Sequence, residues 1–179
     1  MPNAAGRRVP QVTGGLWHHA KVNANGPERI AIVSGYFNPL HVGHLRMMVA
    51  ARELGDRLLV LVNNDDQQLL KKRKIIQPVE HRLEIVRALR IVDQALPTVD
   101  TDPTVIQTLG LVRAEHPLAR LIFANGGDDR SRPEDVAEFA TCQQLNIEFV
   151  FGVGGEDKAD ASSRINQLLD EQVQPHPDR

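Results

Sequence analysis

The stretch that decides the fold joins an apolar run to a loop with two histidines: Ile30-Ala31-Ile32-Val33, then Gly35-Tyr36-Phe37-Asn38-Pro39-Leu40-His41-Val42-Gly43-His44. The apolar run predicts a buried strand over about residues 29–34, and the residues after the loop predict a helix over about 42–54. His41 and His44 therefore stand where a strand ends and a helix begins. Ligands of parallel α/β folds bind at such strand ends, and the free N–H groups of a helix start favour anions. The loop is accordingly a candidate site for phosphate chemistry.

From Glu28 onward, strand and helix patterns alternate, which predicts a parallel sheet covered by helices. The first helix is expected to turn inward Val42, Leu45, Met48 and Val49. Further strands are expected at residues 58–62, 91–96, 118–124 and 147–151. Further helices are expected at residues 78–90, 103–115 and 133–145, and from residue 161. These patterns predict a single α/β domain with five strands over residues 29–172, between an N-terminal extension at 1–28, anchored by Trp17, and a C-terminal tail at 173–179.

The strongest charge run in the chain follows the second predicted strand and reads Lys71-Lys72-Arg73-Lys74. Taken alone it indicates a solvated loop, but its position just after a strand end also fits a mobile basic loop that closes over phosphates. The next helix, at 78–90, is predicted to place Arg82 on an outer face. Its buried stripe is predicted at Val79, Leu83 and Val86.

Composition narrows the class of protein. The chain has 179 residues, a formal net charge of −2 and an apolar fraction of 41%, which together favour one domain and argue against a general nucleic-acid binder. No apolar run approaches the ~20 residues that span a membrane. The pair Arg7-Arg8 is not followed by an apolar export signal, so we expect cytoplasmic residence. Cys142 is the only cysteine, which excludes an intramolecular disulfide and a Cys-rich zinc site; we expect it to be a helix residue rather than a reactive thiol.

Three loops fall at the carboxyl ends of predicted strands: residues 35–44, 126–130 and 152–163. If the strands are parallel, these loops converge on one edge of the sheet, with the basic run nearby. Their shared content is glycines, histidines, hydroxyl groups at a helix start, and cations. That content fits a nucleoside triphosphate.

Nucleotidyl transfer requires stabilisation of charge on the α-phosphate and on the departing pyrophosphate, and it needs no covalent intermediate. His41 and His44 can donate N–H bonds to those oxygens, while Gly43 leaves room for a phosphate near the backbone. Ser162 and Ser163 can add hydroxyl and amide donors. Metal binding is the rival hypothesis for the histidines, but zinc sites usually have three or four protein ligands, and the sequence offers no evident third.

The histidine loop resembles the HxGH signature of the nucleotidyltransferase superfamily that includes cytidylyltransferases and small adenylyltransferases. The resemblance covers roughly Glu28 to Asp170, with its motifs in the order found in that superfamily. It continues through Pro78-Val79-Glu80-His81-Arg82 with Val92-Asp93, then Gly126-Gly127-Asp128, and finally Ala161-Ser162-Ser163-Arg164-Ile165. Several spaced motifs in order are far more specific than HxGH alone.

This resemblance implies a doubly wound, Rossmann-like sheet, usually in a homodimer. It implies transfer of a nucleoside monophosphate from CTP or ATP to a phosphorylated or phosphonate small molecule, with Mg²⁺ on the triphosphate and release of pyrophosphate. The catalytic residues that it implies are His41, His44 and Lys71 or a neighbour. The nucleotide-binding residues that it implies are Gly35, Tyr36, Phe37, Asn38, Gly43, Arg82, Gly126, Gly127, Asp128, Ser162 and Ser163. We expect no metal-ligating side chain and no nucleic-acid or membrane partner.

The base of the triphosphate stays open. Glu80-His81-Arg82 with Val92-Asp93 looks most like the glycerol-phosphate cytidylyltransferases, which favours CTP. Asn38 stands where those enzymes tend to have aspartate, and the Gly-Gly-Asp turn also resembles heptose-phosphate adenylyltransferases, so transfer from ATP to a sugar phosphate is the alternative. Ala161, where many members have serine, and the N-terminal extension give weight to a third hypothesis, a nucleotide-binding module without turnover. The sequence does not identify the acceptor.

Overall fold

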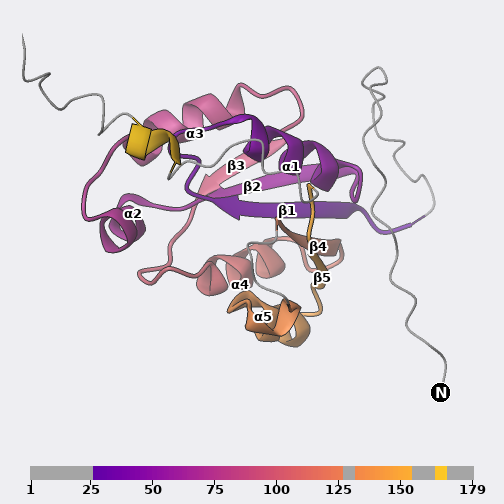
Figure 1. The fold of residues 1–179 in the computed structure, drawn as a ribbon. Coiled ribbons are helices and arrows are strands. Elements are labelled where there is room, and N and C mark those ends of the chain that lie inside the picture. The colour runs from indigo at the N-terminus through magenta and orange to yellow at the C-terminus, as the bar shows by residue number, and fades with distance from the viewer. Residues whose placement is uncertain (1–25, 127–131, 155–163, 169–179) are drawn as a thin grey trace, which may run out of the picture.

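The computed structural model describes residues 26–126, 132–154 and 164–168. Its centre is a sheet whose five strands all run parallel, in the order β3-β2-β1-β4-β5 (Figure 1). The strands are β1 (Arg29–Gly35), β2 (Arg57–Val62), β3 (Gln94–Pro97), β4 (Arg120–Asn125) and β5 (Glu148–Phe151). From β1 the chain moves outward to one side and then to the other, which is a doubly wound topology. The predicted Rossmann-like α/β class with five parallel strands is confirmed.

Helices cover both faces of this sheet. They are α1 (Val42–Arg52), α2 (Asp65–Lys72), α3 (Val79–Arg87), α4 (Ile106–Glu115) and α5 (Glu138–Gln144), with a 3₁₀ turn η1 (Pro133–Asp135) and a helical turn at residues 164–168. α1 and α3 pack on one face, and α4 and α5 pack on the other (Figure 1). Within the described residues, no helix has both the length and the apolar composition needed to cross a membrane.

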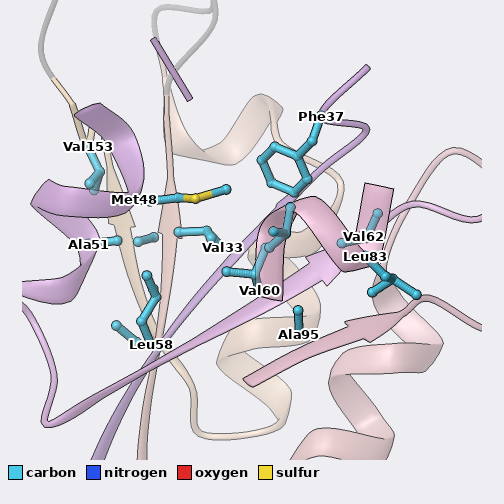
Figure 2. Packing of buried hydrophobic residues seen from close by; sticks show 13 residues of the cluster. Val33, Phe37, Met48, Ala51, Leu58, Val60, Val62, Leu83, Ala95 and Val153 are labelled. Carbon is cyan, nitrogen blue, oxygen red and sulfur yellow. The ribbon is translucent and has the colours of Figure 1, made fainter. Parts of the chain in front are cut away.

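The alternation of side chains along each strand divides the core into two layers. On β1, Ala31 and Val33 belong to the layer of α1 and α3, whereas Ile30 and Ile32 belong to the layer of α4 and α5. The first layer, drawn in Figure 2, also contains Phe37, Met48, Ala51, Leu58, Val60, Val62, Leu83, Ala95 and Val153. Burial on both faces explains why β1 and β2 read as continuous apolar runs.

Some boundaries differ from the predictions. The third strand is Gln94–Pro97 rather than 91–96, because a turn occupies the residues between α3 and Gln94. α1 ends at Arg52, and Val42 is 45% exposed rather than inward, since it occupies the first helical position. Met48 is fully buried, as predicted, and Ala51 supplies the other fully buried contact of α1.

The helix predicted over 133–145 is divided into η1 and α5, because Val136 adopts an extended conformation between them. Cys142 lies buried in α5, as predicted for a helix residue, and burial followed by the charge of Glu138 raises the pKa of its thiol to about 12. Trp17 and almost all of the N-terminal extension lie outside the described residues, as does the C-terminal tail.

The basic run is predicted as a loop, and this prediction is wrong for its first half. Lys71 and Lys72 form the last turn of α2, and Arg73 ends the helix with a φ of 57°. The helix begins with a capping box, in which Gln67 N donates to Asn64 Oδ1 at 2.9 Å and Asn64 N donates to Gln67 Oε1 at 3.1 Å. The capping box and the lysines in the last turn both favour a helix at this position. These two lysines are therefore carried by an ordered helix at the carboxyl edge of the sheet.

Arg82 is predicted on an outer face of α3, but it is 1% exposed, which corrects that prediction. Its guanidinium donates to the carbonyl oxygens of Tyr36 at 3.0 Å, Asn63 at 2.6 Å and Gln77 at 2.9 Å. Nη2 also pairs with the Asp65 carboxylate at 2.7 Å. A buried cation is tolerated here because nearly all of its donors are satisfied. Arg82 thereby ties together the ends of β1 and β2, the start of α2 and the segment before α3.

Replacing Arg82 with methionine (Arg82→Met) removes these bonds while keeping most of the apolar stem. We expect the free energy of unfolding to fall by about 3 kcal/mol, because buried carbonyl groups lose their donor and Asp65 loses its partner. Urea denaturation measures the change. Arg90→Met is the matched control, since Arg90 is exposed just after α3, and we expect it to change stability by less than about 0.5 kcal/mol. Equal, small effects in the two variants would contradict the role assigned to Arg82.

Candidate active site at the carboxyl edge of the sheet

His41 is the N-cap of α1. Its Nδ1 accepts a hydrogen bond from the backbone N–H of Gly43 at 3.1 Å, which satisfies one of the free donors at the helix start. Because Nδ1 accepts this bond, the proton of a neutral His41 ring belongs on Nε2. With this cap in place, Nε2 is the nitrogen of His41 that carries the donor N–H of the neutral ring.

His44 lies directly against His41. The two rings are stacked, with centroids 3.8 Å apart and planes inclined by 30°. Burial, then the charge of His41, then the charge of Lys72 lower the pKa of His44 to about 3. Its Nδ1 is buried and has no hydrogen-bond partner within the described part of the chain. His44 is therefore neutral near pH 7 and acts as a polar donor or acceptor rather than as a cation.

Phe37 supports this pair from the core. Its ring lies among the buried hydrophobic residues drawn in Figure 2. It meets the His44 ring edge-on, with centroids 5.0 Å apart, and Phe37 is 1% exposed. The backbone of Phe37 has a φ of 48°, and a Cβ atom added at Gly35 would lie 2.9 Å from Phe37 Cζ. Gly35 is thus needed for the close approach of this ring. Phe37, predicted to bind the nucleotide, faces the interior here and positions His44.

Asn38 is also predicted to bind the nucleotide, but it is 0% exposed. Its Nδ2 donates to Oε1 of Gln68, a buried residue of α2. Its backbone carbonyl accepts from Lys72 Nζ at 3.2 Å and from Asn166 Nδ2 at 3.4 Å. Asn38 therefore anchors the loop to its neighbours.

Two lysines of α2 lie over the loop. Lys71 Nζ is 4.6 Å from the centroid of the Tyr36 ring, and the Tyr36 hydroxyl donates to the Gln67 carbonyl at 3.3 Å. Lys72 reaches the Asn38 carbonyl. Burial, followed by the charges of Lys71 and Lys74, lowers the pKa of Lys72. The loop is thus bordered by positive charge, which suits an anionic ligand.

The ends of β4 and β5 meet α1 at Met47. A Cβ atom at Gly126 would lie 2.8 Å from Met47 Sδ, and one at Gly154, where φ is 100°, would lie 3.0 Å from Met47 Cα. Val153 N donates to the Asn125 carbonyl at 3.0 Å and holds the two strand ends together. The glycines after β4 and β5 therefore allow these ends to pack against the helix that carries His44.

The structure brings most of the predicted site to one edge of the sheet. The described members there are Gly35, Tyr36, Phe37, Asn38, His41, Gly43, His44, Lys71, Arg82 and Gly126. Gly127, Asp128, Ser162 and Ser163 lie outside the described residues. Sequence reasoning missed Gln68 and Asn166, for which no local pattern gives a signal. It also missed the helical position of Lys72, which the Asn64-x-x-Gln67 capping pattern announces.

The comparisons with known proteins agree with this geometry. The family model described as cytidylyltransferase-like matches residues 32–172. A FAD synthase from Thermococcus onnurineus is 32% identical over 146 residues, which cover 78% of this chain and 90% of the relative. A FAD synthase from Thermococcus kodakarensis is 45% identical over 64 residues, covering 35% of this chain and 43% of the relative.

Two further proteins are similar over most of this chain. The bifunctional protein HldE of Yersinia pestis is 30% identical over 133 residues, which are 73% of this chain but only 24% of HldE. The crystal structure of a lipopolysaccharide core biosynthesis protein from Thermoplasma volcanium superposes with a TM-score of 0.50 at 26% identity, over 70% of this chain and 94% of that one.

The family match spans both the histidine loop and the sheet that presents it, and the T. onnurineus relative aligns over nearly its whole length. The chain belongs to the cytidylyltransferase-like family of nucleotidyltransferases.

Proposed function

We propose that this protein transfers a nucleoside monophosphate from a triphosphate to a phosphorylated or phosphonate small molecule and releases pyrophosphate. The observation that carries the proposal is the stacked pair of His41 and His44 at the start of α1, with Lys71 and Lys72 beside it. Imidazole N–H donors at the start of α1, with ammonium groups from the last turn of α2 beside them, suit the α-phosphate and the leaving pyrophosphate.

In the proposed reaction an oxygen of the acceptor attacks the α-phosphorus in line. A bond forms between that oxygen and phosphorus, and the bond from phosphorus to the bridging oxygen breaks, so that pyrophosphate leaves. Nε2–H of His41 and the ring of His44 hold the phosphate oxygens on which charge develops, and Lys71 or Lys72 neutralises that charge. Ser162, Ser163, Gly127 and Asp128 remain predicted contacts of the phosphates and the nucleotide. Arg82 contributes by holding the loop.

Mg²⁺ is proposed to accompany the triphosphate. Among the described residues, His, Cys, Asp and Glu side chains form no group of three or more that could hold a metal ion. Nucleotide-bound magnesium is usually coordinated by phosphate oxygens and water, with one or two protein carboxylates. The ion would supply charge neutralisation on the triphosphate. A homodimer is proposed from the family resemblance.

For the base, we propose ATP. The sequence motifs favour CTP, but relatives named FAD synthase support ATP. FAD is a dinucleotide that contains adenine, and ATP is the triphosphate that carries this base. CTP is the second candidate, supported by the cytidylyltransferase-like character of the family model. A nucleotide-binding module without turnover is the alternative of another class.

Replacing either histidine tests the proposed site. We expect His41→Ala and His44→Ala each to lower kcat about a hundredfold, because each removes a donor to the transition state. Pyrophosphate release measures turnover, and circular dichroism checks the fold. His81→Ala, at an exposed histidine of α3, is the matched control and should keep normal turnover. Near-normal turnover of both site variants would refute the assignment.

The lowered pKa of His44 predicts a pH dependence of stability. The unfolded ring takes up a proton near its ordinary pKa of about 6.5, whereas the folded ring does so only near a pKa of about 3. The contribution of His44 is therefore complete above about pH 6.5 and is lost as the pH falls from there towards 3. Urea denaturation at about pH 7.5 and about pH 5 should show a larger loss in the wild type than in His44→Gln. Equal losses would contradict a buried neutral His44.

Parallel pyrophosphate-release assays with ATP and CTP separate the hypotheses on the base. The acceptor panel contains phosphorylated polyols, sugar phosphates, a flavin phosphate, choline and ethanolamine phosphates, and phosphonates. We expect turnover with ATP and at least one of these acceptors. Turnover with CTP alone would restore the cytidylyl hypothesis. Binding of both triphosphates without pyrophosphate release from any mixture would favour the nucleotide-binding module without turnover.

A further inference from the structure

The backbone carbonyl of Asn38 is the meeting point of three segments that are distant in sequence. Lys72 Nζ, from the last turn of α2, donates to this oxygen at 3.2 Å. Asn166 Nδ2, from the helical turn at 164–168, donates to the same oxygen at 3.4 Å. A carbonyl oxygen accepts two hydrogen bonds, so these two donors fill its capacity.

A second residue of α2, Gln68, also forms a hydrogen bond with Asn38. Gln68 and Lys72 are four residues apart, so they lie on the same face of α2. Gln68 accepts from the Asn38 side chain while Lys72 donates to the Asn38 carbonyl. Gln68 is itself fixed, because its Oε1 also accepts from Ile76 N at 2.8 Å. α2 therefore binds Asn38 through both its side chain and its backbone carbonyl.

Asn166 brings a second segment, the C-terminal helical turn, to Asn38. This contact joins residues 128 positions apart in the chain. The turn that bears Asn166 lies at the end of the molecule towards which β1 points, as does α2 (Figure 1). Asn38 stands three residues before His41. A hydrogen bond at this carbonyl therefore acts directly on the backbone that leads into the histidine pair.

We propose that Asn166 is a positioning residue, which docks the C-terminal helical turn onto the histidine loop through the Asn38 carbonyl, in addition to the contacts that α2 makes with the same residue. The proposal rests on the proposed function for its catalytic consequence, but the docking itself is a property of the free protein. No motif of the sequence marks Asn166. Its role follows from the shared carbonyl acceptor.

The carboxamide of asparagine can donate this hydrogen bond to the Asn38 carbonyl, whereas an ionised carboxylate of similar shape cannot. Aspartate has the same size but cannot donate when ionised, and it would place a negative charge beside the carbonyl oxygen. Glutamine keeps the donor on a longer stem. Alanine removes both donor and bulk. These three substitutions at one position therefore separate loss of the hydrogen bond from loss of packing.

Hydrogen–deuterium exchange of the free protein tests the docking. We expect Asn166→Ala and Asn166→Asp to speed exchange in peptides that span residues 36–45, and Asn166→Gln to restore most of the protection. Leu168→Ala is the control, because Leu168 is half exposed on the same turn, and it should leave these peptides unchanged. Exchange in Asn166→Ala and Asn166→Asp that equals the wild type would overturn the proposal.

Kinetics test the consequence. With any acceptor that supports turnover, we expect Asn166→Ala and Asn166→Asp to lower kcat/KM for the triphosphate about fivefold, while KM for the acceptor stays constant and Asn166→Gln recovers activity. Normal kcat/KM in both variants would overturn the catalytic consequence. If the wild type releases no pyrophosphate with any acceptor, the proposed function fails, and the exchange experiment alone then decides whether Asn166 docks the turn.

Discussion

The buried guanidinium of Arg82 is the interaction on which the carboxyl edge of the sheet depends. It holds the carbonyl groups that end β1 and β2, and it pairs with Asp65 at the start of α2. A charge in this position is stable only while its acceptors stay in place. Arg82 therefore links the two strand ends to the start of α2 and to the segment before α3, and the loop with His41 starts from this frame.

The frame has an electrostatic consequence at the histidine pair. Lys71 and Lys72 border the loop, and the carboxylate nearest to Arg82 is already paired with it. Burial and the neighbouring positive charge lower the pKa of His44, so His44 is kept neutral in an environment that favours an anion. A phosphate entering such a site meets the N–H donors of the imidazole rings and the ammonium groups of the two lysines. That arrangement is suited to stabilising charge as it develops.

Particular elements show how far prediction from sequence reaches. β1, β2 and the loop between β1 and α1 were predictable, because strands buried on both faces leave continuous apolar runs. α2 was not predicted, because the run of basic residues at its end is typical of a solvated loop. The capping pattern at Asn64 and Gln67 was the local feature that indicates the helix. Arg82 was assigned to an outer face, because an arginine in a helix is usually exposed and nothing local reveals buried acceptors.

The sequence by itself determined the α/β class, the alternation of strands and helices that predicts a parallel sheet, and the residues at the strand ends. Each of these depends on local periodicity and motif spacing. Only the tertiary structure decided what those residues do for one another. Phe37 and Asn38 are buried and support the histidine loop from inside. Arg82 joins two strand ends. Asn166 donates to the carbonyl of Asn38, which is 128 residues earlier in the chain. The physical reason is that burial and hydrogen-bond partnership are set by segments that meet only after the sheet has formed.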